Sequence, residues 1–219
     1  MQGSGYLAIW SDLAPEDETD WAHWMTREHA AERVGIDGFL ACRIWRAAGA
    51  TINRYLILYE LETPDVVGSP AYLARLNAPS AWSQRMMPRL RNFVRGGGRV
   101  AASAGLGQGG VLAAVPLDAK PDWGAAAVCR ELAGLDRIAA ARVLLTDAAQ
   151  TSIQTREKGM RDRDESFAGL LLIEALDQMS LRDALWRVQL LVPQLDARRI
   201  EQQRVYRMMF NLHRRLLPG

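Results

Sequence analysis

The sequence predicts an α+β fold in which two tandem ferredoxin-like βαββαβ units pack sheet to sheet. The expected order of strands and helices occurs twice along the 219 residues. Each unit would form a four-stranded antiparallel sheet with its own helices on one face and the other face uncovered. Packing the two uncovered faces together buries both of them. We therefore divide the chain into a first unit at 1–104, a glycine-rich linker at 105–110 and a second, degenerate unit at 111–219.

The first unit begins with an apolar strand, and the acidic run after Pro15 suits a helix amino terminus. Gly35 ends this helix, and two β-rich segments then form a hairpin. A second helical region breaks near Pro79, and glycines at 96–98 interrupt the fourth strand. The predicted strands are 6–13, 39–46, 54–61 and 93–102, and the predicted helices are 16–34 and 72–89.

The second unit repeats this order with mostly small and aliphatic strand residues. Its predicted strands are 111–117, 138–146, 167–176 and 204–212, and its helices are 121–133 and 181–192. A polar segment of balanced charge at 147–166 joins the second pair of strands, and we expect an exposed arm or long loop there. Because the second unit is so aliphatic, we expect a single pocket, in the first unit.

Composition excludes several classes of protein. With 49% hydrophobic and 24% charged residues, the chain is neither disordered nor a small disulfide-stapled scaffold. Its two cysteines, Cys42 and Cys129, lie in apolar segments, which favours a reduced, cytoplasmic setting. No apolar stretch approaches the ~20 residues of a membrane span, and the formal net charge of +2 is slight and diffuse. We expect neither a membrane nor a nucleic acid as partner.

The linker formally matches the dinucleotide-binding pattern G-x-G-x-x-G at Gly105, Gly107 and Gly110. That fingerprint must follow a strand and open a helix, so that a phosphate meets the helix amino terminus. Here the glycines precede a predicted strand. We interpret them as a connection between the two units rather than as a cofactor site.

The first helix carries the chemically most informative residues. Its apolar stripe consists of Trp21, Trp24, Met25 and Ala31. On an α-helical wheel Glu28 and Glu32 fall inside this stripe, His29 lies at its edge and Arg33 lies just beyond it. Two carboxylates on a buried face need partners or a polar cavity, because an unpaired buried charge is costly. The pattern therefore predicts a polar pocket beneath the helix.

Three interpretations of this helix compete. Glu28 and Glu32 could form structural ion pairs with strand arginines such as Arg43 or Arg46. Alternatively, His29 acts as a general acid or base, oriented by a neighbouring carboxylate, because imidazole titrates near neutral pH. A metal site is the least favoured, since the chain has only three histidines and no H-E-x-x-H spacing.

Aromatic and basic strand residues could form the pocket wall. Alternation places Trp10 on one side of the first strand, Arg43 and Trp45 on one side of the second, and Tyr59 on one side of the third. A one-residue error in register would move each set to the opposite face. An aromatic core between the sheets is therefore an equal alternative to a ligand site.

The segment from Glu28-His29 through Glu32-Arg33 to Gly38-Phe39 resembles the signature E-H-x-x-E-R…G-F of EthD-like members of the dimeric α/β-barrel superfamily. The resemblance implies that two ferredoxin-like units pack sheet to sheet as an α/β barrel. It also implies that the helix histidine, His29, and the acid beside it, Glu28, belong to the active site. The motif-level similarity covers roughly the first unit, and the second unit is similar only in its order of elements.

We therefore expect a cofactor-free lyase or isomerase, decarboxylase- or cyclase-like, that acts by proton transfer on a small aromatic or carbonyl compound. Catalysis is assigned to His29, Glu28 and Arg43. Substrate binding is assigned to Trp10, Trp45, Tyr59, Glu32 and Arg33. No metal or cofactor is expected, because a haem would need an axial histidine in the second unit and His213 is poorly placed.

Two other functions stay open at this point. In a cofactor-independent monooxygenase, an electron-rich substrate anion would react directly with oxygen in the same pocket. In a non-catalytic ligand-binding or stress-related barrel, Glu28 and Glu32 would be structural pairs and no closed cavity would adjoin His29. A homodimer is also open, because unpaired edge strands favour association.

Overall fold

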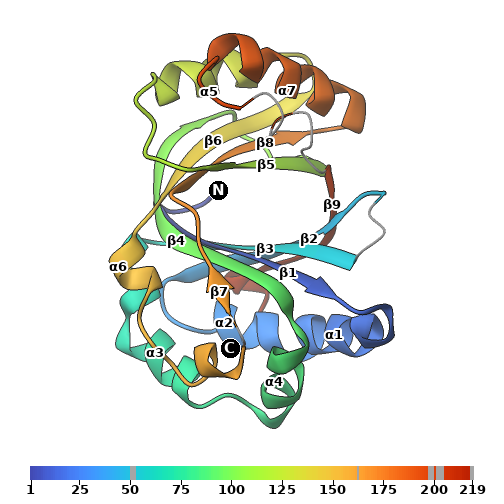
Figure 1. Ribbon diagram of the computed structural model, residues 1–219, viewed down its shortest axis with the longest axis vertical. Helices are drawn as coiled ribbons and strands as arrows, with labels where there is room; N and C mark the ends of the chain where they lie inside the picture. Colours follow the sequence, from blue (N-terminus) through green and yellow to red (C-terminus); the bar gives the residue numbers. More distant parts are fainter. Residues whose placement is uncertain (50–52, 162, 197–199, 201–204, 218–219) are drawn as a thin grey trace.

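The computed structural model describes residues 1–219 except 50–52, 162, 197–199, 201–204 and 218–219. The first unit contributes strands β1 (Gly5–Leu13), β2 (Phe39–Ala47), β3 (Asn53–Leu61) and β4 (Arg91–Ala104). The second contributes β5 (Val111–Leu117), β6 (Ile138–Thr146), β8 (Gly169–Ala175) and β9 (Tyr206–His213). Their order is β1-β3-β2-β9-β5-β8-β6-β4, and pairing of β1 with β4 closes an antiparallel barrel (Figure 1). The predicted α+β architecture is confirmed.

Helices cover the outside of the barrel in two layers (Figure 1). The layer on the first unit contains α1 (Glu18–Trp24), α2 (Ala30–Val34), α3 (Pro70–Asn77) and α4 (Ala81–Met86). The layer on the second unit contains α5 (Ala125–Ala133) and α7 (Gln178–Leu191), while the short α6 (Ala148–Thr151) lies at the side of the barrel. Each layer buries its own apolar core against the sheet. A third core lies in the barrel interior, where the two sheets face each other.

An ionic cluster inside the barrel joins the two units. The Arg43 guanidinium contacts Glu174 at 2.7 Å and Glu60 at 3.1 Å. Arg142 contacts the other oxygen of Glu174 at 2.7 Å. All four side chains are almost completely buried, and they come from β2, β3, β6 and β8. The mutual pairing offsets the large cost of taking these charges out of water.

Most predicted element boundaries agree with the structure within a few residues. β4 ends at Ala104 and β5 begins at Val111, on either side of the glycine-rich connection. The predicted break near Pro79 lies between α3 and α4. The last strand begins at Tyr206; its predicted first residue, Arg204, is outside the described residues.

The glycines at 96–98 do not interrupt β4, contrary to the prediction. They pair with β1 as part of one continuous strand. A Cβ atom on Gly98 would lie 2.2 Å from the carbonyl oxygen of Leu145, and one on Gly96 would lie 2.4 Å from the Phe167 ring. Glycine is therefore used here for close approach of neighbouring groups to the backbone.

The edge strands of the two four-stranded sheets are paired within the chain. β2 pairs with β9 and β6 pairs with β4, so both edges of each four-stranded sheet are joined to the other unit.

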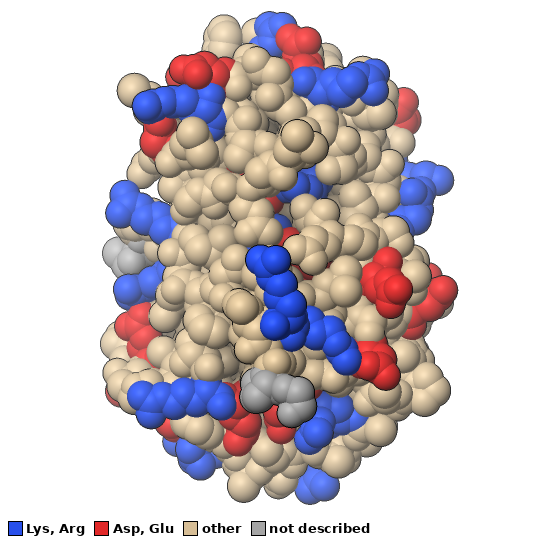
Figure 2. Space-filling model, turned by 180° about the vertical axis from the view of Figure 1, so that it is seen from behind, with Lys and Arg blue, Asp and Glu red and all other residues tan. Residues whose placement is uncertain are grey.

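Figure 2 shows basic and acidic side chains interspersed over one face of the molecule. Within the described part of the chain, no helix has the length and apolar character needed to cross a membrane.

The charged segment 147–166 is the long connection that the sequence predicts, but it does not project from the molecule as an arm. It descends from the second unit along the side of the barrel and packs against the first (Figure 1). Its short strand β7 (Asp164–Glu165) pairs in parallel with Phe93 and Val94 of β4. Glu157 is 3% exposed and forms an ion pair with Arg33, and Arg161 is paired with Asp164. Balanced charge allows this burial because opposite charges pair within the interface.

Candidate active site beneath the first helix

A π-helical turn interrupts the helix that carries His29. The turn spans Met25–His29, between α1 and α2. Its closing hydrogen bond runs from the Ala30 N–H group to the Met25 carbonyl, five residues earlier. A π turn holds one more residue than an α turn, so everything after it is rotated by about 100° around the helix axis.

This rotation decides which side chains point towards the sheet. His29 is 6% exposed and Arg33 is 2% exposed, whereas Glu28 and Glu32 lie at partly exposed positions. The prediction that the two carboxylates occupy the buried stripe is therefore wrong. The physical reason is the extra residue in the turn, which brings His29 and Arg33 into the positions that a regular helix would give to the two acids.

His29 lines a small, partly enclosed cavity between the helix layer and the outer face of the first sheet. The cavity volume is about 40 Å³, which is room for roughly three water molecules. Its apolar wall consists of Ile9, Trp24, Met25, Ile57, Leu76, Met87, Leu90 and Phe93. Its polar lining consists of His29, Arg33, Tyr59, Tyr72, Arg95, Thr155, Glu157, Lys158 and Arg161.

Burial keeps the imidazole of His29 neutral. Desolvation lowers the pKa of His29 well below its usual value of 6.5, and the nearby charges of Arg33 and Arg161 lower it further. The ring stacks at a tilt on Trp24, with centroids 4.2 Å apart. Its Nδ1 atom has no hydrogen-bond partner among the described residues. The pocket thus presents a neutral imidazole with an unused polar atom.

Three guanidinium groups surround the cavity. Arg33 forms a buried ion pair with Glu157. Arg95 donates to the Thr151 carbonyl at 3.1 Å. Arg161 makes two hydrogen bonds to Asp164, at 2.7 and 2.8 Å, and its guanidinium carbon lies 3.9 Å from the centre of the Phe93 ring.

The cavity lining therefore carries more positive than negative charge, with four basic side chains and one carboxylate. In a dry site such cations stabilise a developing anion more strongly than they would in water.

The second unit supplies the cover of this cavity. Thr155, Glu157, Lys158 and Arg161 all belong to the segment 147–166. Besides the ion pair with Arg33, Glu157 is fixed by its backbone N–H group, which donates to the Leu76 carbonyl at 3.1 Å. The cavity beside His29 is thus completed by residues that follow His29 by more than a hundred positions in the sequence.

The structure brings together only some of the predicted site residues. His29, Arg33 and Tyr59 line the same cavity. Glu28 instead accepts a hydrogen bond from the Ser80 hydroxyl at 2.6 Å, and Glu32 pairs with Arg75 at 3.4 Å. The sequence suggested Arg43 or Arg46 as partners of these two acids, and the structure gives them other partners.

Arg43, Trp10 and Trp45 lie on the opposite face of the sheet from His29. Arg43 belongs to the ionic cluster in the barrel, and Trp45 is fully buried in the barrel core. Trp10 lines a separate cavity at one mouth of the barrel. The wall that the sequence predicted is thus divided between two faces, because alternate strand residues point to opposite sides of the sheet.

Sequence reasoning missed Arg95, Arg161, Glu157 and Tyr72. Arg95 directly precedes the glycines at 96–98, and such a glycine run indicates a backbone feature rather than a role for the neighbouring side chain. The cover residues carry no sequence signal of their position, since their charge balance is equally typical of a solvated loop.

The described residues offer no ligand cluster for a metal ion, and the axial haem ligand expected in the second unit has a single candidate. The described residues contain no group of three or more histidine, cysteine or acidic side chains that could hold an ion. The second unit has one histidine, His213, which is the last residue of β9. Its Nδ1 atom lies 3.4 Å from the side-chain nitrogen of Gln2.

No family model and no curated protein matches the chain. A solved anthrone oxidase-like protein superposes with a TM-score of 0.56 at 13% identity, covering 98% of this chain and 94% of that chain. A protein from Fusobacterium nucleatum subsp. nucleatum, provisionally assigned as a monooxygenase, gives 0.53 at 11%, covering 97% and 96%. A protein provisionally assigned as a chlorite dismutase gives 0.55 at 13%, covering 94% and 95%. These similarities show a fold like that of the dimeric α/β barrels.

Proposed function

We propose that this chain is a cofactor-independent monooxygenase that oxidises an acidic aromatic ketone or phenol in the first unit, with His29 as the base. The observation that carries the proposal is the neutral, buried imidazole in a partly enclosed cavity flanked by guanidinium groups. The anthrone oxidase-like and monooxygenase-like proteins of similar fold support it. The EthD-like relation of the segment around His29 is part of the same proposal.

The first step is removal of a proton from carbon or oxygen of the substrate. The His29 imidazole accepts this proton, and the substrate becomes a resonance-stabilised anion. The anion and the imidazolium form together as a pair, so the net charge of the cavity does not change. Arg33 and Arg161, whose charges already act on His29, stabilise the oxyanion form of the substrate.

The second step is addition of molecular oxygen to the anion. The carbanion gives its electron pair to oxygen, and the imidazolium returns its proton to the resulting peroxide. Loss of the remaining C–H proton then breaks the O–O bond and releases water. A CH₂ group and one O₂ thus become a carbonyl group and one H₂O, with oxygen as the oxidant. Exclusion of bulk water protects the anion from protonation before oxygen arrives.

An aromatic substrate needs a larger space than this cavity of about 40 Å³. The segment 147–166 forms one wall, and α3 together with Met87 and Leu90 forms another, so we expect this segment to move when substrate enters. The Arg33–Glu157 ion pair and the β4–β7 pairing hold it in the closed position. The closed form corresponds to the water-excluding state of a covered active site.

The same base also fits the lyase or isomerase that the sequence predicts. In that case the anion is protonated at another atom, or loses carbon dioxide, and oxygen takes no part. The non-catalytic alternative expects no closed cavity beside His29, and the partly enclosed cavity there supports an enzymatic role instead.

Anthrone, which has an acidic CH₂ between two aryl rings, is a suitable first probe. We expect uptake of one O₂ per anthraquinone formed, above the rate of the enzyme-free reaction. His29→Asn should lower kcat by about 10²–10⁴-fold, the usual contribution of a general base. His23→Asn, on the same helix but outside the cavity lining, is the matched control and should keep full activity.

Oxygen consumption separates the two enzymatic proposals. Turnover of an acidic aromatic substrate without oxygen uptake would favour the lyase or isomerase. If the His29→Asn variant keeps wild-type kcat, the assignment of the base is wrong in both.

A further inference from the structure

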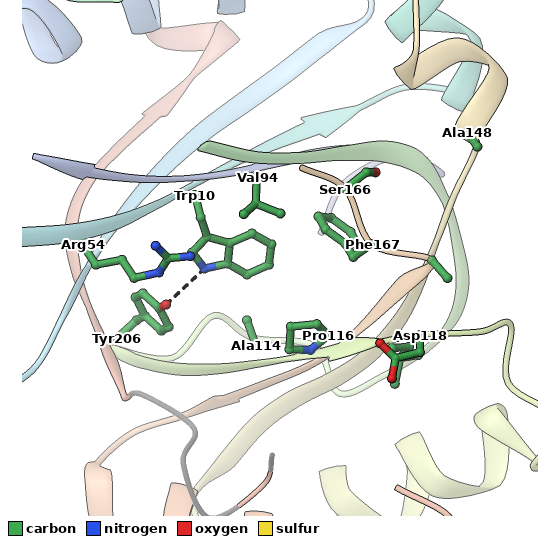
Figure 3. A pocket seen from close by; sticks show the side chains of 12 residues that line it. Trp10, Arg54, Val94, Ala114, Pro116, Asp118, Ala148, Ser166, Phe167 and Tyr206 are labelled. Carbon is green, nitrogen blue, oxygen red and sulfur yellow. Dashed lines mark hydrogen bonds between the residues drawn. The ribbon is translucent and has the colours of Figure 1, made fainter. Parts of the chain in front are cut away.

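A second, larger cavity opens at one mouth of the barrel (Figure 3). Its volume is about 610 Å³, within the range of about 300–1,000 Å³ that is typical of small-molecule sites. An eight-stranded barrel is just wide enough either to be filled by side chains or to hold one small ligand. A packed core occupies the barrel interior, and beside it the small side chains of Ala114 and Ala168 leave room at this mouth.

Aromatic rings form one side of this cavity. The rings of Trp10 and Phe167 meet edge to face, with centroids 5.4 Å apart and planes at 84°. The Phe167 ring lies directly on the backbone of Gly96, where any side chain would collide with it. The indole N–H of Trp10 donates to the Tyr206 hydroxyl at 3.1 Å. The rings of Trp10 and Phe167 are thus held in fixed orientations beside the cavity.

The two ends of the cavity carry opposite charges (Figure 3). Arg54 lies at the end beside Trp10 and Tyr206, and Asp118 lies at the other end. Asp12 accepts from Arg54 at 2.7 Å and from the Asn92 amide at 2.8 Å, which fixes the guanidinium in place. The planar guanidinium has further N–H groups beyond the one used in this pair.

We propose that this barrel-mouth cavity binds an aromatic carboxylate, with its ring beside Trp10 and Phe167 and its carboxylate at Arg54. The apolar wall of Val94, Ala114 and Pro116 accommodates the ring. A guanidinium recognises a carboxylate through directed, charge-assisted hydrogen bonds. The site lies inside the barrel, on the opposite face of the first sheet from His29, and does not depend on the proposed oxidation.

Calorimetric titration of the wild-type chain with 1-naphthoate tests the proposal. We expect saturable binding of one equivalent with a Kd of about 1 mM or tighter. The neutral analogue 1-naphthylmethanol should bind at least about tenfold more weakly, because it lacks the charge that Arg54 recognises. In the Arg54→Gln variant this preference should disappear, and Arg54→Lys should restore part of it.

Filling the cavity tests the location. Ala114→Phe should weaken naphthoate binding at least about tenfold, because the new ring occupies the ligand space. Ala126→Phe makes the same change at an exposed position of α5 and should leave binding unchanged. Melting curves show whether each variant is folded.

A measurement on the wild type covers the case in which Ala114→Phe does not fold. The indole N–H resonance of Trp10, assigned with Trp10→Phe, should shift as naphthoate is added. Absence of saturable binding overturns the proposal. So does binding that leaves the Trp10 resonance unshifted, or binding that is equally tight in a folded Ala114→Phe variant.

Discussion

The buried neutral state of His29 makes the stability of the fold depend on pH. In the unfolded chain the imidazole should titrate near its usual pKa of 6.5, whereas in the fold its pKa is well below that value. Between these two values the unfolded state binds a proton that the folded state does not bind. Stability is therefore complete above pH 6.5 and is lost as pH falls from there towards the folded-state pKa.

The size of this effect follows from proton linkage. Between pH 7.5 and pH 5.5, a histidine with an unfolded pKa of 6.5 and a much lower folded pKa removes about 1.4 kcal/mol from the free energy of unfolding. For a chain of 219 residues, this corresponds to a fall in Tm of about 3–6 °C. Carboxylates and other groups add their own pH dependence, so the contribution of His29 must be taken as a difference.

Urea unfolding of the wild type and of His29→Asn at the two pH values isolates that difference. The asparagine does not titrate, and the variant should lose about 1.4 kcal/mol less than the wild type over this interval. Unchanged m-values would show that the unfolded state exposes the same surface in both proteins. Equal losses in the two proteins would refute the reasoning, because they would mean that His29 takes up a proton equally well when folded.

Three further predictions concern buried ionisable side chains. Glu174→Gln leaves two buried guanidiniums without their shared carboxylate and should cost about 3–5 kcal/mol in urea unfolding, whereas Glu131→Gln, in an exposed pair, should cost less than about 1 kcal/mol. Glu157→Gln removes the partner of buried Arg33, so limited proteolysis within 147–166 should become faster. With an identified substrate, kcat/KM should persist below pH 6.5, because free-enzyme His29 stays neutral there.

The fold was largely predictable because its signals are local. Strand alternation, glycine breaks and the repeat of element order identified the eight strands of the barrel. Which residues of each strand face the helices and which face the barrel interior was not predictable in the same way. In β3, Tyr55, Ile57 and Tyr59 face the helices while Leu56 and Leu58 face the barrel, and both sets are buried and apolar. With no polar face to mark the outside, alternation alone cannot assign the sides.

The candidate site was predictable only in part. His29 was identified because imidazole is rare in this chain and stands beside acids. Its true neighbours were not identified, because the π turn at Met25–His29 has no hydrophobic pattern of its own and shifts the phase of the wheel. The result exchanges Glu28 and Glu32 for His29 and Arg33 on the buried face, so the lining of the pocket has more basic side chains than acidic ones.

The different lengths of two corresponding hairpins explain how the two units share one site. In the first unit β2 ends at Ala47 and β3 begins at Asn53, whereas in the second β6 ends at Thr146 and β8 begins only at Gly169. The closure entropy of a longer loop rises slowly with its length, so the extra residues cost little if they make contacts. Those contacts are made on the other unit, where Glu157 pairs with Arg33. The lining of the cavity beside His29 is therefore complete only when both units are folded together, which ties the candidate site of the first unit to the stability of the second.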